Sequence, residues 1–120
     1  MHELSIAQNI VEIIHARVRE DELANVRSVK LRVGTFSGVV PHSLKFCYEA
    51  LIADTGLNHS RIDIETVSFV IKCSDCSKQS NVDNGFALCP SCGSRKTMIV
   101  SGNELDIVEI ILQENQAEHA

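Results

Sequence analysis

Apolar side chains recur every three or four residues near the start of the chain, which predicts an amphipathic helix. The positions of this repeat are Leu4, Ala7, Ile10, Val11, Ile14 and Val18. The acidic stretch at 20–22 and Asn25 mark its predicted end.

A second helix is predicted to begin at Pro41. Proline is favourable in the first turn of a helix, because an N–H group there would have no partner within the helix. It is predicted to end at Thr55 and Gly56, and its apolar stripe consists of Leu44, Cys47, Tyr48 and Leu51.

Three further segments carry the patterns of β-strands. Strict alternation over 29–33 predicts a strand with one buried face. A second strand is predicted over about 61–71, and because its apolar phase changes, we expect a bulge or a departure from the sheet near Thr66. The almost continuous apolar run 105–112 predicts the last strand, and the polar tail 113–120 is expected to fray. Helices and strands in this order predict an α+β fold.

The segment 72–97 interrupts this pattern with a different composition. It is rich in Cys, Ser, Asn, Gly and Asp, and the apolar residues between its cysteine pairs are Val82, Phe86, Ala87 and Leu88. About 25 residues of this kind cannot bury enough apolar surface to fold alone. We therefore predict a domain formed by 1–71 plus 98–120 and an inserted small domain at 72–97 that its cysteines hold together.

Four cysteines form two Cys-x-x-Cys pairs, Cys73/Cys76 and Cys89/Cys92, which are separated by twelve residues. Two such turns can direct four thiolates at one point, with backbone N–H groups of each turn donating to the thiolates, and a tetrahedron of sulfurs suits structural Zn²⁺. Iron in the same cage is an alternative, because Cys-Pro-x-Cys-Gly resembles the rubredoxin pattern, although Phe86 is the one aromatic residue of the segment. A thioredoxin-like dithiol is a further alternative, but it normally has one Cys-x-x-Cys pair that opens a helix. The fifth cysteine, Cys47, is interpreted as a small core residue.

Charge and hydropathy narrow the function classes. The chain has 120 residues and a net charge of −5, which argues against a broad basic face for nucleic acid. Its apolar runs are shorter than the ~20 residues that span a bilayer, and the N-terminus does not read as a secretion signal. We therefore expect a cytoplasmic protein without a membrane anchor, in a compartment where cysteines stay reduced.

The N-terminus offers a second set of metal ligands. With histidine at position 2, the Met1 amine, the His2 backbone nitrogen and the His2 imidazole are three adjacent nitrogen donors, and Glu3 adds a carboxylate. A planar nitrogen set suits Ni²⁺ or Cu²⁺, and these donors do not by themselves identify the metal. A chance histidine at a chain terminus is the alternative interpretation. His15, His42, His59 and His119 have no second ligand at helical spacing and are not predicted to bind metal.

Together, these motifs resemble the HypA/HybF family of nickel-delivery proteins in [NiFe]-hydrogenase maturation. The resemblance extends from residue 1 to about residue 112. It is carried by the four cysteines and by the sequences Met-His-Glu-Leu-Ser (1–5), Val-Gly-Thr-Phe-Ser-Gly-Val-Val-Pro (33–41), Ser-Leu-Lys-Phe (43–46) and Gly-Asn-Glu-Leu (102–105).

The resemblance implies two helices on a three-stranded sheet as a nickel domain, with a zinc-ribbon-like domain inserted before the third strand. It implies Ni(II) as transient cargo at Met1, His2 and Glu3, and structural Zn(II) at Cys73, Cys76, Cys89 and Cys92. Its implied partners are a HypB-type GTPase and the hydrogenase large subunit. Separately, the hinges of the insert, near Ile71 and Thr97, could permit exchange of elements between the copies of a homodimer. Some family members add a zinc-domain histidine as a nickel ligand, whereas this chain has no histidine between His59 and His119.

We expect a metallochaperone and not an enzyme. The chain lacks the Gly-x-x-x-x-Gly-Lys-[Ser/Thr] motif that cradles nucleotide phosphates, and it shows no nucleophile–base pattern. The alternative hypothesis is a zinc-ribbon adaptor that docks proteins and has no nickel role of its own. Four basic residues against two acids in the segment 72–97 are interpreted as a solvated face or a docking patch.

Overall fold

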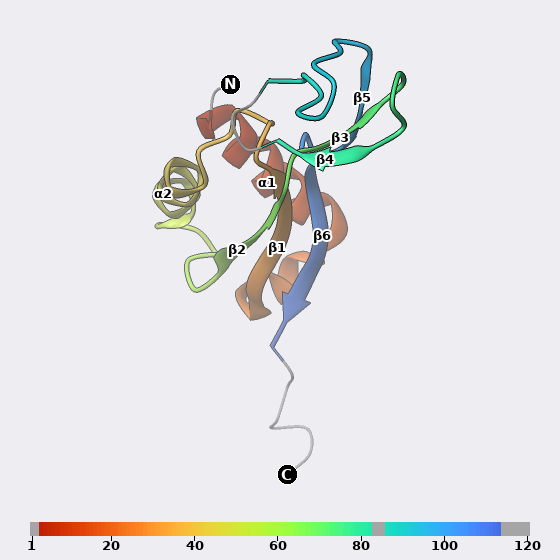
Figure 1. Cartoon of the computed structure of the whole chain (residues 1–120). Helices are drawn as coiled ribbons and strands as arrows, with labels where there is room; N and C mark the ends of the chain where they lie inside the picture. The colour runs from red at the N-terminus through yellow and green to blue at the C-terminus, as the bar shows by residue number, and fades with distance from the viewer. Residues whose placement is uncertain (1–2, 83–85, 114–120) are drawn as a thin grey trace. The chain divides into compact units, whose positions relative to one another are not determined.

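A computed structural model describes residues 3–82 and 86–113 of the chain (Figure 1). These residues group into two compact units, and each unit is described here by itself. The first unit comprises the described parts of 1–31, 40–64 and 107–120, and the second comprises those of 32–39 and 65–106. The described helices belong to the first unit, and strands occur in both units, which confirms the α+β class.

Two helices pack against each other in the first unit. They are α1, Glu3–Arg17, and α2, Pro41–Ile52. The buried side chains of α1 are Ala7, Ile10 and Ile14, and those of α2 are Leu44, Tyr48 and Ile52. These residues follow the spacing that the sequence predicts for one helix face. Two members of the predicted stripe of α2, Cys47 and Leu51, are only half-buried, because the buried face is centred on Leu44 and Tyr48.

The prediction that the first helix reaches the acidic stretch was wrong. The helix α1 ends at Arg17, and Glu20–Asn25 form a separate 3₁₀ helix, η1. The acids Glu20, Asp21 and Glu22 lie in the first turn of η1. Carboxylates are favourable at this end of a helix, where free N–H groups point outward, and they would be unfavourable at the C-terminal end of α1.

The first sheet has the strand order β2-β1-β6 and matches the predicted three strands. The strands are β1, Val26–Gly34, β2, Arg61–Val67, and β6, Leu105–Leu112. In β1 the residues Val29, Leu31 and Val33 are buried and Arg32 is exposed, as the alternation predicts. The predicted tail lies outside the described residues, apart from Gln113, whose N–H donates to Asn25.

The predicted departure near Thr66 is confirmed. The strand β2 ends at Val67, and the chain continues as β3, Val70–Cys73, in a second sheet. That sheet has the order β4-β3-β5, with β4 at Gln79–Asn81 and β5 at Thr97–Ser101, and both strands pair antiparallel to β3. The phase change of the apolar pattern therefore marks a change of sheet.

The core of the second unit draws on residues beyond the segment 72–97. Phe69 and Ile71 are each 1% exposed and cluster with Val82, and the ring of Phe36 stacks on that of Phe69 with centroids 4.1 Å apart. The segment alone has too little apolar surface, so residues before it complete the core. That residues 72–97 act as a zinc domain inserted into a nickel domain stays a prediction.

Two glycines allow three segments of the second unit to meet. A Cβ on Gly34 would lie 1.9 Å from the carbonyl oxygen of Gly102, and one on Gly102 would lie 2.4 Å from the Cα of Phe69. The N–H groups of Gly34 and Phe36 donate to the carbonyls of Glu104 and Gly102, at 2.8 and 2.6 Å. Contact this close leaves no room for a side chain at either position.

A buried hydroxyl pair connects α2 to the loop before β2. The hydroxyl of Ser60 donates to the carbonyl of Leu57 at 2.6 Å, so the Tyr48 hydroxyl, 2.6 Å from Ser60 Oγ, is the donor of that pair. Burial raises the pKa of Tyr48, and the hydrogen bond with Ser60 partly offsets this.

We expect Tyr48→Phe to lower the free energy of unfolding by about 1–2 kcal/mol, because the buried Ser60 hydroxyl loses its hydrogen-bond donor. Urea unfolding measures this loss of stability. The prediction is contradicted if the variant and the wild type unfold at the same midpoint urea concentration.

Candidate metal centre

The two Cys-x-x-Cys turns have the same backbone geometry. In the first turn the N–H of Ser77 donates to the carbonyl of Cys73 at 2.9 Å, and the N–H of Cys73 donates to that of Lys78 at 2.9 Å. In the second turn Gly93 donates to Cys89 at 2.8 Å and Cys89 donates to Ser94 at 3.0 Å. The donors and acceptors lie at equal spacing from the first cysteine of each pair. The turns are thus two copies of one local structure.

The residue after each pair adopts a left-handed conformation. Ser77 has a φ of 63° and Gly93 a φ of 74°. No heavy atom lies within 4 Å of a Cβ built on Gly93, so the cost of a side chain there is conformational and not steric. A non-glycine residue in this region costs about 1–2 kcal/mol.

We therefore expect opposite effects from two exchanges. Gly93→Ala should destabilise the zinc-loaded second unit by about 1–2 kcal/mol, whereas Ser77→Gly should stabilise it by about 0.5 kcal/mol after the greater chain entropy of glycine is counted. Denaturant unfolding of both zinc-loaded variants measures these effects. Equal stability of Gly93→Ala and wild type would show that the second turn tolerates a side chain.

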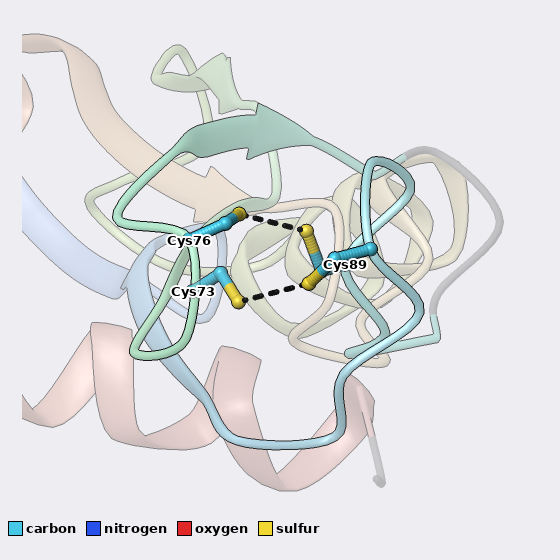
Figure 2. Close-up of side chains that lie close together, drawn as sticks. Cys73, Cys76 and Cys89 are labelled. Atoms are coloured by element: carbon cyan, nitrogen blue, oxygen red, sulfur yellow. Dashed lines mark hydrogen bonds between the residues drawn. The ribbon is translucent and has the colours of Figure 1, made fainter.

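The four sulfur atoms face one another in the second unit (Figure 2). All four lie within 4.8 Å of one another, with Cys73 and Cys92 at 3.6 Å and Cys76 and Cys89 at 3.5 Å. Sulfurs bound to one Zn²⁺ at ~2.3 Å in a tetrahedron are about 3.8 Å apart. The observed spacing therefore fits a metal site and is far too long for disulfides. Because these two contacts join different turns, the cysteines form one set and not two separate dithiols.

Backbone N–H groups stabilise the thiolate form of the first cysteine in each pair. The sulfur of Cys89 accepts hydrogen bonds from the N–H groups of Cys92 and Ser91, which lower the pKa of this thiol to about 6. The sulfur of Cys73 accepts equivalent bonds, above all from the N–H of Cys76, and its pKa is also lowered. Thiolates are the metal-binding form of cysteine. The backbone thus prepares two of the four ligands for metal.

The second cysteine of each pair is held protonated by its neighbours. The N–H of Ser94 lowers the pKa of Cys92, but the thiol of Cys73 and the other sulfurs outweigh it and raise the value to about 12. The pKa of Cys76 is raised as well, because the neighbouring thiols outweigh the N–H of Lys78. Four thiolates this close repel one another unless a cation lies between them. The donor set therefore fits a divalent metal that displaces the remaining protons.

This set resembles a structural site more than a redox site. Four protein sulfurs close a tetrahedron and leave no position for a substrate. The side chain of Phe86, the one aromatic residue of the segment 72–97, is 64% exposed and does not shield the cluster as a redox centre requires. The turns are also tied together, because Ser94 Oγ donates to the carboxylate of Asp75 and the N–H of Ser74 donates to the carbonyl of Lys96. Zinc therefore fits the cluster as a structural ion that holds the second unit together.

Of the predicted nickel ligands, Glu3 alone lies among the described residues, and Met1 and His2 lie outside them. Glu3 is the first residue of α1, and its Oε2 accepts the N–H of Val40 at 3.2 Å, next to the start of α2. This bond ties the first residue of α1 to the residue before α2.

An open hollow of about 450 Å³ adjoins Glu3 in the first unit. Its lining residues are Glu3, Leu4, His42, Ser43, Phe46 and Cys47. Spacing along the chain does not connect Glu3 with His42 or Cys47, so sequence reasoning missed their shared location. Among the described residues, the four cysteines form the one group whose ligand atoms all lie within 4.8 Å.

None of the helices in the described part of the chain is long and apolar enough to cross a bilayer.

Comparison with known proteins assigns both units to one family. Residues 1–112 match the family described as "Hydrogenase/urease nickel incorporation, metallochaperone, hypA". A hydrogenase maturation factor HypA from Prosthecochloris aestuarii is 40% identical over 113 residues, which cover 94% of this chain and all of the relative. The HypA of Chlorobium luteolum is 35% identical over 114 residues, which cover 95% and 97%.

A solved structure has the same fold. The solution structure of the Ni metallochaperone HypA from Helicobacter pylori superposes with a TM-score of 0.64 and covers 96% of this chain and 100% of that one. Its sequence identity is 18%, so this likeness establishes the fold.

Proposed function

The chain belongs to the HypA family of nickel-incorporation metallochaperones, and from this premise we propose that it binds Ni(II) at its N-terminus and delivers it to the large subunit of a [NiFe]-hydrogenase. The observation that supports the proposal is the family match, whose range of 1–112 includes the residues proposed here as nickel ligands. In this proposal nickel is cargo, bound for transfer, and zinc is a resident structural ion.

The proposed nickel ligands are the Met1 amine, the backbone nitrogen and imidazole of His2, and a contribution from Glu3. Three adjacent nitrogens favour the square-planar geometry of Ni²⁺. Glu3 contributes a carboxylate to the proposed site, and the same carboxylate accepts the N–H of Val40, the residue before α2.

The proposed zinc ligands are Cys73, Cys76, Cys89 and Cys92. The sulfur spacing and the N–H groups directed at the thiolates support this assignment. Bound zinc supplies no redox chemistry and stabilises the second unit, since the free energy of metal binding contributes to folding. The cytoplasm is the proposed location, because thiols stay reduced and available to zinc there.

The proposed partners are a HypB-type GTPase, as the source or regulator of nickel, and the hydrogenase large subunit, as its acceptor. An exposed terminal site suits transfer, because an incoming ligand can replace one donor at a time. Transfer breaks only the coordination bonds to nickel, and the released amine, amide and imidazole nitrogens take up protons from solvent, so no covalent bond of the chaperone changes other than by protonation. The role is accordingly that of a carrier and not of an enzyme.

Delivery is tested by mixing the nickel-loaded, zinc-loaded chain with metal-free large subunit, with and without the GTPase. We expect nickel to appear on the large subunit in the presence of a chelator that captures free Ni²⁺, and His2→Ala to supply none. Metal analysis after separation measures this. Partner binding that is equal with and without nickel, together with no transfer, would instead support a zinc-ribbon adaptor.

A further inference from the structure

His42 and Glu3 line the same hollow of the first unit, although they are far apart in the sequence. Glu3 is the first residue of α1, and His42 is the second residue of α2. The residues whose nitrogens form the proposed nickel site, Met1 and His2, directly precede Glu3 in the sequence. Helical spacing gives His42 no second ligand on its own element, whereas the hollow gives it a neighbour that belongs to the proposed site.

Packing and a hydrogen bond hold the starts of the two helices together. The helices α1 and α2 pack against each other, and Ala7 and Leu44, near their first turns, are both 0% exposed. Oε2 of Glu3 accepts the N–H of Val40, the residue before α2, at 3.2 Å. The backbone that carries His42 is therefore fixed near Glu3 by contacts that join the two helices.

The imidazole of His42 is available as a ligand. The side chain is exposed, and it makes no hydrogen bond or ion pair with another residue that the structure describes. Glu3, in contrast, is half-buried and already accepts the N–H of Val40. His42 therefore gives up no contact within the described residues when it binds a metal, whereas Glu3 has a structural bond to keep.

The proposed terminal site has three nitrogen donors, and a planar Ni²⁺ ion needs a fourth donor. Imidazole is a donor that nickel favours, whereas carboxylates suit harder ions such as Mg²⁺ and Ca²⁺. An imidazole in the fourth position completes a plane of four nitrogens. The chemistry of the metal thus favours His42 over Glu3 for this position, and Glu3 then contributes its negative charge and its bond to Val40.

Cys47 lines the same hollow and is the competing donor. At 1.5 Å of rise per residue, His42 lies about 3 Å along the axis of α2 from Val40, whereas Cys47 lies about 10 Å from it. Because Glu3 is bonded to Val40, it lies at the end of the hollow that His42 lines. The geometry of the helix therefore favours the imidazole over the thiol.

We propose that the imidazole of His42 supplies the fourth donor of the terminal nickel site, so that the second helix closes a site that the chain terminus begins. This inference rests on the proposed function and identifies the ligand through which that site exchanges its metal. The donors of Met1 and His2 are adjacent in the chain and form chelate rings with nickel, whereas His42 is a single donor from a distant segment.

A single donor is the ligand that an acceptor protein replaces first. In this step the bond from nickel to the His42 nitrogen breaks, and a bond from nickel to the incoming ligand forms. The imidazole leaves as a neutral group, and the metal stays Ni(II). The chelate of the terminus holds the ion until this first exchange is complete, so nickel is not released to solvent.

Nuclear magnetic resonance of the zinc-loaded chain with nitrogen-15-labelled histidines tests this ligand directly, because planar Ni²⁺ is diamagnetic. One equivalent of Ni²⁺ should move the ring-nitrogen signals of His2 and His42. The signals of His15 and His59, which are exposed and do not line the hollow, should stay in place. The signals of His42 are identified by their absence from the spectrum of His42→Ala.

Nickel affinity and absorption provide a second readout. We expect His42→Ala to weaken nickel binding by about tenfold to a hundredfold, which is less than for His2→Ala, because the three terminal donors remain. The absorption band of the planar ion should move to longer wavelength, since water replaces an imidazole. Cys47→Ser, in the hollow, and His59→Ala, outside it, are matched controls that should change neither affinity nor spectrum. One zinc per chain and an unchanged urea midpoint show that His42→Ala is folded.

Three results would overturn the proposal and leave the proposed function standing. In the first, Ni²⁺ moves the signals of His2 but not those of His42. In the second, His42→Ala binds nickel with the affinity and the spectrum of the wild type. In the third, Cys47→Ser shifts the absorption band, which assigns the fourth position to the thiol. If neither His2 nor His42 responded to Ni²⁺, the proposed function would fail together with the proposal.

Discussion

Replacing Cys89 by serine is expected to abolish zinc retention and to unfold the second unit. Cys89 is 3% exposed, and its sulfur lies 3.5 Å from that of Cys76 within the four-sulfur set. Structural zinc contributes roughly 10–16 kcal/mol in small zinc-binding peptides at neutral pH. The apolar cluster of Phe69, Ile71 and Val82 is too small to replace such a contribution.

Metal analysis and amide hydrogen exchange measure the two consequences of Cys89→Ser. We expect less than one zinc per chain and loss of exchange protection in β3 and β5, while α1 and α2 stay protected because they pack on each other. Cys47→Ser is the matched control, since Cys47 lies outside the cluster and should leave zinc in place. If Cys89→Ser kept a full zinc ion per chain, the four cysteines would not be the zinc ligands.

The second large effect concerns the N-terminus, where His2→Ala is expected to weaken nickel binding by more than about a hundredfold. Loss of a residue that merely orients a ligand costs about 10–100-fold in metal affinity, so loss of the imidazole itself should cost more. A glycine added before Met1 should have a similar effect, because it removes the α-amine from its place beside His2. Competition with a chromogenic chelator measures both affinities.

Zinc content and fold should be unchanged in both terminal variants, because the cysteines lie in the other unit. His15→Ala is the matched control, since His15 is exposed on α1 and is not a predicted ligand. If His15→Ala and His2→Ala weakened nickel binding equally, the terminal site would not be specific. Retention of one tightly bound nickel by the extended chain would exclude a role for the Met1 amine.

Local periodicity predicted the elements of this chain well. The helices around Ala7 and Leu44 and the strand around Leu31 follow from apolar spacing, because each buries one face. The end of α1 was misplaced, since acids that are unfavourable at a helix C-terminus belong instead to the first turn of η1. The position at which a helix ends depends on such local electrostatics more than on the apolar pattern.

Contacts between distant segments were beyond sequence reasoning. The ring of Phe36 packs on Phe69, and Gly34 meets Gly102, although more than thirty residues separate the partners in each pair. Nothing in the spacing of these residues predicts that the second unit recruits 32–39 to its core. The predicted insert, 72–97, is therefore shorter than the compact unit that contains it, which comprises 32–39 and 65–106.

The cysteine cluster and the N–H groups around it were predictable from the two Cys-x-x-Cys turns. Two such pairs predict four convergent sulfurs, and the structure brings all four together. The N–H groups of the turns donate to the sulfurs of Cys73 and Cys89, as predicted. In contrast, the hollow that His42 and Cys47 line beside Glu3 depends on how the first turns of α1 and α2 meet. The assignment of nickel to Met1 and His2 stays a prediction.

Titration of the zinc-loaded, untagged chain with Ni²⁺ is the measurement that tests the proposed N-terminal nickel site. Calorimetry should give one Ni²⁺ per chain, absorption should show a planar, diamagnetic centre, and His2→Ala should abolish both signals. No binding by the wild type, or binding that His2→Ala leaves unchanged, would contradict a terminal nickel site and leave a protein with structural zinc alone.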